Sequence, residues 1–368
     1  MVKDEYWKSC LSKRSANYYR DSRYAWALAK ALSKKQIDVS LIYNGYFDPG
    51  YKGEYFDVIE SSIFKKTTNY LAIPLARKMN SVALKFYAKE YEDSIVHFCG
   101  SDYSGLKLFN NTVATIHDVR FDLLFDFKSG GFIRNLLDSI YRDFINLKML
   151  RDVRSAAKII SISNVVKSQL ERHRIRSQVI HHWIDSSVFK KRDKALSRRK
   201  LGLPENSKLI LNVSNGTKNK ALSFLQETVN LLPEGYMLIK IGTPLKGRNI
   251  LNVGKVPDEL YPLYFNASDL YLNVSTFEGF GIPQIEALGS GLPVLARDIS
   301  INREVLAEAG MYFDAYIEPP HDLAQVVVHS IEEYERDGLG DKMEKVARRL
   351  NEDTAISEYL KVYSSIGH

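Results

Sequence analysis

The sequence predicts an α/β protein with two domains, each built on a parallel sheet. The chain has 368 residues, which is longer than a domain with a single hydrophobic core usually is. Short apolar runs alternate with helical stretches along most of the chain, as in sheets built from βα units. The stretch 270–296 shows the repeating unit most clearly, because it reads as strand, glycine turn, helix and strand.

The first half contains a series of predicted strands separated by helices. The apolar runs lie at 38–43, 56–59, 95–99, 112–116, 158–162 and 178–181. A helix is predicted over 22–33, where Ala25, Leu28, Ala29 and Leu32 recur at helical spacing. No strand is evident before this helix.

Two further stretches of the first half, 70–90 and 132–150, show helical periodicity. An apolar stripe in the second of them ends at Leu147. The basic residues in and just before the first stretch are Lys65, Lys66, Arg77, Lys78, Lys85 and Lys89. Such a stripe is typical of the core-facing side of a helix, and it also fits a helix lying in lipid headgroups. The sequence leaves both interpretations open.

The second half begins with a polar, basic linker over 190–200. Strands are predicted at 208–213, 237–241, 250–253, 270–274 and 292–296, and helices at 221–231 and 283–288. Pro283 suits the first turn of a helix, while Gly289 and Gly291 end it.

Composition excludes several classes of protein. Apolar residues make up 45% of the chain, which is ample for packed cores and argues against disorder. Cys10 and Cys99 are the two cysteines, and no cysteine or histidine spacing typical of a metal site occurs. No signal peptide is recognised, and no apolar run is long enough to span a bilayer. A reducing, cytoplasmic location is expected.

Positive charge is concentrated in the first half. Residues 1–182 contain 29 Lys and Arg against 19 Asp and Glu, a net charge of +10. Residues 183–368 contain 22 against 25, a net charge of −3. A basic surface attracts phosphate, nucleic acid or anionic lipid, although a solvated surface with no partner is equally compatible.

The most informative motif is 275–294, Ser-Thr-Phe-Glu-Gly-Phe-Gly-Ile-Pro-Gln-Ile-Glu-Ala-Leu-Gly-Ser-Gly-Leu-Pro-Val. Glu278 lies on the loop after a predicted strand, and Glu286 lies on the following helix. Ligands of open α/β sheets bind at this edge, and the first turn of a helix offers N–H groups to an anion. Two carboxylates beside those N–H groups can hold a polyhydroxyl ligand that carries phosphate.

This motif resembles the signature of family 4 of the retaining glycosyltransferases. The resemblance is strong over 208–330 and fair over 95–190. It implies the GT-B fold, with two Rossmann-like domains facing a central cleft and a last helix that crosses back to the first domain. The expected bounds are 1–187 for the acceptor domain, 188–350 for the nucleotide-sugar domain and 351–368 for the returning helix.

The resemblance also implies roles for residues of the second half. Glu286 would accept hydrogen bonds from ribose hydroxyls, and Glu278 would bind hydroxyls of the transferred sugar. The backbone N–H groups expected to hold the diphosphate are those of Phe280, Gly281 and Ile282. Lys218 matches a diphosphate-binding lysine of the family. An arginine of the family falls on Asn215, so one positive charge is missing, and Lys220 is the candidate to compensate for it. The segment 256–264 would border the nucleobase.

In the first half, Thr115-Ile-His-Asp resembles a family segment that directs its histidine into the cleft. His117 would then lie near the transferred sugar, with Asp118 beside it, although a structural histidine is the alternative. The family's glycine-rich first loop is replaced here by a segment with Arg20 and Arg23. These arginines are candidates for binding the donor phosphates or the acceptor, or else they are surface charges at a helix start.

The expected function is the transfer of a hexose from a GDP- or UDP-linked sugar to a glycan or lipid-linked hydroxyl acceptor, with retention and without a metal ion. Peripheral association with an anionic membrane is expected, and nucleic acid is not an expected partner. The alternatives are another GT-B enzyme, such as an epimerase or phosphorylase, and a non-catalytic protein that binds sugar nucleotides. A nucleic-acid binder is suggested only by the basic first half.

Overall fold

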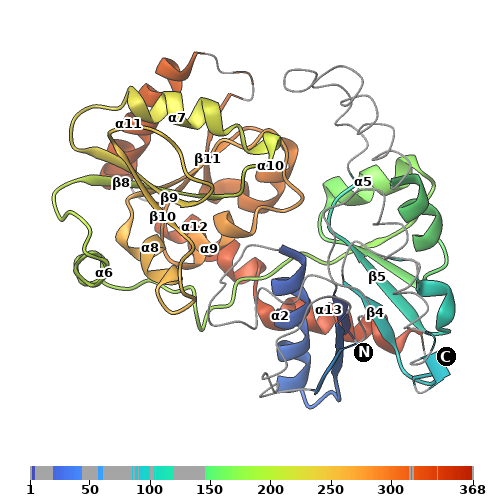
Figure 1. Cartoon of the computed structure of the whole chain (residues 1–368). Helices are drawn as coiled ribbons and strands as arrows, with labels where there is room; N and C mark the ends of the chain where they lie inside the picture. The colour runs from blue at the N-terminus through green and yellow to red at the C-terminus, as the bar shows by residue number, and fades with distance from the viewer. Residues whose placement is uncertain are drawn as a thin grey trace. The chain divides into compact units, whose positions relative to one another are not determined.

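The computed structural model describes residues 2–4, 20–43, 57–60, 85, 88–89, 91–99, 103, 105–119, 146–314, 316, 319–337 and 339–366. The chain divides into two compact units (Figure 1). The first unit takes in the described residues up to Ile180 and again those from Ile356 onward. The second unit is His181–Ala355.

The described strands of the first unit form a parallel sheet in the order β3-β2-β1-β4-β5-β6-β7. They are β1 (Val2–Asp4), β2 (Ser40–Tyr43), β3 (Asp57–Glu60), β4 (Val96–Phe98), β5 (Thr112–Ile116), β6 (Lys158–Ser161) and β7 (Gln178–Val179). The strand that was not evident in the sequence is β1, which pairs with both β2 and β4.

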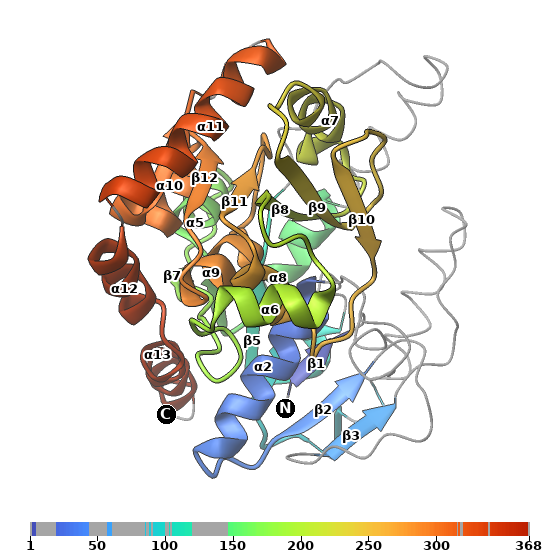
Figure 2. The same ribbon diagram turned by 90° about the vertical axis from the view of Figure 1, so that its left-hand side faces the viewer.

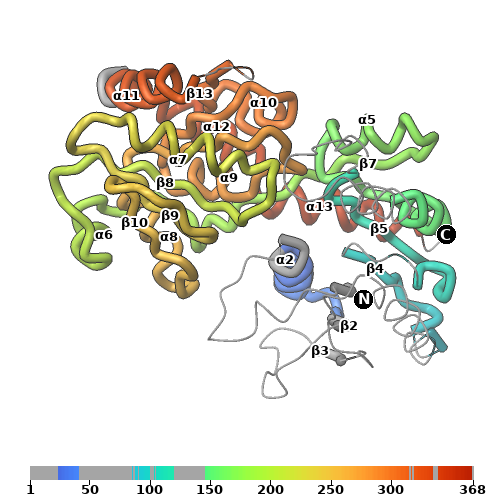
Figure 3. Tube along the Cα trace, turned by 45° about the horizontal axis from the view of Figure 1, so that its top comes forward, coloured from blue at the N-terminus to red at the C-terminus, as the bar shows by residue number. Residues whose placement is uncertain are grey.

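Helices of the first unit include α2 (Arg20–Lys34), α5 (Asn164–Arg172) and, from Ile356 onward, α13 (Glu352–Ser364). The four apolar residues that predicted α2 are buried. Apart from its first turn, this helix follows the expected bounds. The helix α13 lies near β4 and β5 (Figure 3). For the apolar stripe that ends at Leu147, the sequence left open a core-facing and a lipid-facing helix. Leu147 is 58% exposed, whereas Leu150 and Val153 are buried. The helix ends with Leu150 and Val153 facing inward, so the core-facing interpretation does not hold at Leu147.

The second unit contains a parallel sheet in the order β10-β9-β8-β11-β12-β13 (Figure 2). Its strands are β8 (Lys208–Ser214), β9 (Tyr236–Gly242), β10 (Ile250–Gly254), β11 (Leu270–Asn273), β12 (Val294–Arg297) and β13 (Gly310–Phe313). The strands β9 and β10 lie on one side of β8, and β11, β12 and β13 lie on the other side. The strand order therefore reverses between β8 and β11, which is the kind of switch point where α/β sheets bind ligands.

Helices cover both faces of this sheet. They are α6 (Lys194–Leu201), α7 (Leu222–Asn230), α8 (Tyr261–Ala267), α9 (Ile282–Gly289), α10 (Ser300–Leu306), α11 (Pro320–Asp337) and α12 (Gly340–Arg349). α7 and α11 lie on one face, and α8, α9 and α12 lie on the other (Figure 1). The core under α7 and α11 includes Leu225, Val229, Leu238 and Leu323, all of which are fully buried.

The stretch 190–200, expected to be a linker, instead contains most of α6. The side chain of Asp193 accepts a hydrogen bond from the backbone of Leu196 and so caps the helix. Gly202, at φ 64°, ends it. The α/β class with parallel sheets is confirmed. No helix in the described ranges is long and apolar enough to cross a membrane.

Candidate functional site

The glycine loop, residues 275–281, connects β11 to α9 at the carboxyl edge of the second sheet. Gly281 has φ 86°, a left-handed conformation that glycine adopts without steric cost. A Cβ at this position would lie 2.4 Å from the side-chain amide of Gln284. Pro283 sits in the first turn of α9, where the backbone N–H has no partner within the helix. The loop therefore delivers the N–H groups of a helix start to the sheet edge.

A buried amide network fixes this loop. Gln284 is fully buried, and its Nε2 donates to the carbonyl of Phe280 at 3.1 Å and to Oδ1 of Asn302 at 3.1 Å. Its Oε1 accepts from Nδ2 of Asn273 at 2.9 Å. Asn302 in turn donates to the carbonyl of Arg297 at 2.8 Å. Residues of β11 and α10 thus fix the side chain of Gln284 on α9, and this side chain in turn fixes the glycine loop.

Lys220 and Glu278 form a buried ion pair between neighbouring loops. The ammonium of Lys220 donates to Oε1 of Glu278, and the two side chains are 5% and 4% exposed. Lys220 ends a short 3-10 turn, η2 (Lys218–Lys220), and the next residue, Ala221, has φ 46°. This turn directs Lys220 inward, whereas Lys218 is exposed.

The lysine loop, residues 215–220, is tied to the glycine loop through Asn219. Its Nδ2 donates to the carbonyl of Phe277 at 2.9 Å, and its carbonyl accepts from the N–H of Thr276 at 2.9 Å. Asn215 is exposed, and its Oδ1 accepts from the hydroxyl of Thr217 at 2.7 Å. Asn215, which stands at the position of the family's arginine, therefore forms a hydrogen bond within the lysine loop.

Glu286 is 6% exposed and lies on the second turn of α9. Its Oε2 accepts from the hydroxyl of Tyr261 at 2.8 Å. Tyr261 begins α8 and belongs to the segment 256–264 that was expected to border the nucleobase. The structure thus brings Glu286 and this segment together.

Two neighbouring histidines, His181 and His182, pack against the glycine loop. The ring of His182 meets that of Phe280 edge-on, with centroids 5.0 Å apart. The ring of His181 lies 5.7 Å from Phe280, and its Nε2 is 2.7 Å from Oε1 of Glu304 on α10. Residues 181–182 therefore pack on Phe280 of the loop, and His181 also contacts α10.

In the first unit, His117 follows β5 at the carboxyl edge of its sheet. Its Nε2 lies 2.9 Å from the carbonyl of Cys99, and its ring packs edge-on to Tyr24 at 4.8 Å. Because a carbonyl only accepts, Nε2 carries the hydrogen. Asp118 is half-buried beside it. Arg20 and Arg23 lie on the first turn of α2, and their side chains lie outside the described part of the chain.

The motif threonine, Thr115, is the centre of a buried network that the sequence did not reveal. Its hydroxyl lies 2.7 Å from Nε2 of His97 and 3.1 Å from the hydroxyl of Tyr24. Nδ1 of His97 lies 2.7 Å from the hydroxyl of Tyr363, and Tyr24 also contacts Tyr359 at 2.5 Å. Burial lowers the pKa of His97 to about 3, so its imidazole is neutral.

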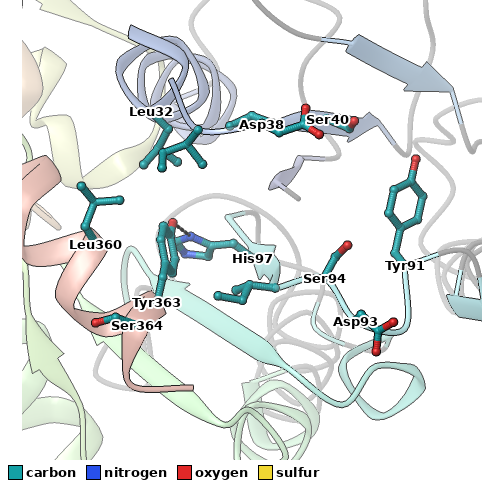
Figure 4. Close-up of a pocket in the computed structure, with 13 residues that line it drawn as sticks. Leu32, Asp38, Ser40, Tyr91, Asp93, Ser94, His97, Leu360, Tyr363 and Ser364 are labelled. Carbon is teal, nitrogen blue, oxygen red and sulfur yellow. Dashed lines mark hydrogen bonds between the residues drawn. The ribbon is translucent and has the colours of Figure 1, made fainter. Parts of the chain in front are cut away.

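A cavity of about 700 Å³ opens at the other edge of the first sheet (Figure 4). Asp38 and Ser40 line it at the start of β2, and Ser94 lines it just before β4. His97 and Tyr363 form part of its wall. The cavity lies at the amino-terminal ends of these strands, away from the carboxyl edge that carries His117.

The predicted residues of the second unit therefore converge on one sheet edge, with two loops interlocked and two carboxylates buried. His117 and Asp118 occupy the corresponding edge of the first unit. In the described part of the chain, no three His, Cys, Asp or Glu side chains gather closely enough to hold a metal ion.

Two family models match the chain. The model described as glycosyl transferases group 1 matches residues 193–353, and the one described as Glycosyltransferase Family 4 matches residues 22–188. The O-antigen biosynthesis glycosyltransferase WclY of Escherichia coli is 23% identical over 203 residues, which is 52% of this chain and 56% of that protein. The chain spans about half the length of such curated relatives.

Solved structures with the same fold cover both units. Sucrose-phosphate synthase from Thermosynechococcus elongatus has a TM-score of 0.78 at 15% identity, covering 99% of this chain and 98% of that one. HepE from Anabaena, in complex with UDP-glucose, has a TM-score of 0.70 at 16% identity, covering 99% of each chain. The two parallel sheets, the motif at 275–294 and both family models agree. The chain therefore belongs to the family 4 (group 1) glycosyltransferases of the GT-B fold.

Proposed function

We propose that this protein transfers a hexose from a nucleotide-diphosphate sugar to a hydroxyl group of a glycan or lipid-linked acceptor, with retention of configuration. The observation that carries the proposal is the buried Lys220–Glu278 pair beside the start of α9. A cation, a carboxylate and helix N–H groups at one sheet edge suit a ligand that combines a diphosphate with a sugar.

In this proposal the diphosphate binds the N–H groups of Phe280, Gly281 and Ile282. Lys218 and Lys220 donate to its oxygens, since an ammonium has three donors and Lys220 can keep its bond to Glu278. As the glycosidic bond breaks, negative charge grows on the leaving diphosphate, and fixed donors stabilise it most at that point. These groups perform this task without a metal ion.

The two glutamates bind different parts of the donor. Glu286 accepts hydrogen bonds from the ribose, and the Tyr261 hydroxyl fixes the orientation of its carboxylate. Glu278 accepts from hydroxyls of the departing sugar. Since Lys220 neutralises Glu278, the pair can lie close to a diphosphate without net repulsion.

The acceptor is proposed to bind the first unit, with His117 near the transferred sugar and Asp118, Arg20 and Arg23 on the acceptor side. The hydrogen bond from Nε2 of His117 to the Cys99 carbonyl fixes the orientation of the imidazole. A glycan acceptor is supported by the relative named for O-antigen biosynthesis. UDP is the first nucleotide to test, because the similar HepE structure is a complex with UDP-glucose.

A nucleotide-sugar panel tests the function. Thermal shift with UDP-glucose, UDP-N-acetylglucosamine, GDP-mannose and the free nucleotides identifies the donor, since a ligand that binds the native state stabilises it. The donor is then assayed with and without glycan acceptors, and the anomer formed is read by NMR. Turnover without any acceptor would indicate an epimerase or hydrolase, and binding without turnover would indicate a binding protein.

We also propose that the basic first half attaches the protein reversibly to an anionic membrane surface. Lys85 and Lys89 are exposed, while Lys65, Lys66, Arg77 and Lys78 lie outside the described residues. Each basic residue near an anionic bilayer contributes about 1 kcal/mol. Co-sedimentation with vesicles containing phosphatidylglycerol should fade as salt rises, and Lys78→Glu with Lys85→Glu should abolish it. No binding at low salt would rule the attachment out.

A further inference from the structure

Lys240 is a fully buried lysine in the middle of the second sheet. It lies on β9 among Leu238, Ile239 and Ile241, and its exposed fraction is 0%. Lysine is almost never buried to this extent unless it has partners. Burial, reinforced by the charge of Lys220, lowers the pKa of Lys240 to about 7.

The amino group of Lys240 anchors the start of the lysine loop. Its Nζ donates to the carbonyl of Ser214 at 2.9 Å and to that of Ile241 at 2.9 Å. Ser214 is the last residue of β8, so the loop departs from this carbonyl. The N–H of Thr243 donates to the same oxygen at 3.1 Å. A Cβ on Gly242, at φ 100°, would lie 2.2 Å from it, so the two strand ends are locked together.

The charges around Lys240 favour the binding of an anion nearby. Lys220 is the charge that acts on it, and Glu278 is the described partner of Lys220. On α7, one of the two helices that cover this face, the charged residue is Glu227, which is exposed. Lys255, after the neighbouring strand β10, is also exposed. Two lysines and one carboxylate therefore form a buried cluster with an excess of positive charge whenever Lys240 is protonated.

We propose that Lys240 is a positioning residue of the donor site, and that its amine takes up a proton as the donor diphosphate binds. The protonated form then supplies the positive charge that Asn215 does not carry. A neutral amine has two N–H groups, which match the two carbonyls, so the anchor persists in the free protein and only the charge changes. The proton comes from solvent. This inference rests on the proposed function, because it needs a diphosphate at the lysine loop.

Calorimetric binding of UDP-glucose and GDP-mannose between about pH 6.5 and pH 8.5 tests the inference. In two buffers with different ionisation heats, the wild type should take up a fraction of one proton that grows above neutral pH. Its affinity should fall by up to about tenfold per pH unit, the limit for one linked proton. Lys240→Met should bind with the weak affinity of the wild type at high pH, and with a flatter profile. Lys240→Arg should retain the low-pH affinity throughout.

Lys208→Met is the matched control, because Lys208 lies at the opposite end of β8 from Ser214, and it should keep the wild-type profile. A Lys240→Met protein that keeps the wild-type pH slope would overturn the inference, even if it binds more weakly at every pH. Should this variant fail to fold, absence of proton uptake by the wild type would overturn it equally. Failure of the wild type to bind any nucleotide sugar would overturn the proposed function, whereas binding without proton linkage would overturn this inference alone.

Discussion

Glu278 and Glu286 are both buried carboxylates, but their described partners differ. Glu278 pairs with a lysine, and Glu286 accepts from a tyrosine hydroxyl. A ribose contact changes little between ground and transition states, whereas contacts to the departing sugar strengthen as charge develops. Glu286→Ala should therefore raise KM for the donor about tenfold or more with kcat nearly unchanged.

Glu278→Ala should lower kcat by about a hundredfold or more. Steady-state kinetics with the identified donor separates the two variants. Because Glu278→Ala leaves Lys220 buried without its described partner, its melting temperature must be measured as well. Wild-type kinetics in both variants would contradict the assignment of the site.

Lys218 and Lys220 should behave differently because only one of them is buried. Lys220→Met should weaken nucleotide-diphosphate binding and destabilise the fold by about 3–5 kcal/mol, since it removes the described ion-pair partner of the buried Glu278 carboxylate. Lys218→Met should weaken binding of UDP but not of uridine, with the melting temperature unchanged. Calorimetry with both ligands measures this. An equal loss for UDP and uridine in Lys218→Met would remove Lys218 from the site.

The sequence could place both lysines on a loop after a strand, but it could not say which one lies inside. That is decided by the 3-10 turn at η2 and by the left-handed backbone of Ala221. The left-handed backbone conformation costs an alanine about 1–2 kcal/mol relative to its usual conformations, and no residue pattern predicts it. The glutamates were easier to predict, because their positions follow from a helix start marked by Gly281 and Pro283.

Among the elements, the glycine loop depends on Gln284. Replacing this fully buried amide by leucine would leave polar groups of Asn273, Phe280 and Asn302 without the partner that it provides. Gln284→Leu should therefore lose about 1–3 kcal/mol of stability and loosen the loop. Hydrogen exchange over residues 277–283 should rise, and kcat should fall together with donor affinity.

The control for this variant is Gln325→Leu, at an exposed position on α11. It should change neither the exchange of the loop nor the kinetics. Unchanged exchange over residues 277–283 in Gln284→Leu would mean that the amide network does not hold the loop.

Prediction succeeded for α2, which has apolar periodicity, and failed for α6 and β1, which lack it. α6 buries an arginine rather than an apolar stripe: Arg198 is 6% exposed, and its guanidinium donates to Asp269 at 2.6 Å and to the carbonyl of Ala267 at 2.9 Å. Those partners lie about seventy residues away, so no local pattern reports them. β1 has three residues, which is too short for any alternation to be recognised.

At the scale of the whole molecule, the last helix, α13, closes the first unit through buried contacts with residues far away in the sequence. Tyr24 meets Tyr359 across 335 residues, and His97 meets Tyr363 across 266. The resemblance led us to expect that the last helix returns to the first domain. It could not show that the return is made through a buried histidine and tyrosines, because contacts at this separation depend on the assembled fold.

Because His97 is buried in these contacts, we expect the free energy of unfolding to fall in acid. His97 has a pKa of about 3 in the folded protein against an ordinary value of 6.5, because burial disfavours its charged form. Between these values the unfolded chain binds more protons than the folded one, so the free energy of unfolding falls as pH falls. The loss contributed by His97 begins near pH 6.5, approaches about 1.4 kcal/mol per pH unit below it, and ends near pH 3.

Urea denaturation at several pH values between about pH 4 and pH 7 measures this dependence. His97→Gln keeps a hydrogen-bonding side chain but cannot be protonated in this range. The variant should be less stable than the wild type near neutral pH, because its amide fits the Thr115 and Tyr363 hydroxyls less well, yet it should lose less stability on acidification. His329→Gln, at a histidine whose side chain is 72% exposed, should keep the wild-type pH dependence. If His97→Gln and the wild type lost stability in parallel as pH falls, His97 would not be the group that links the closure of the first unit to acid.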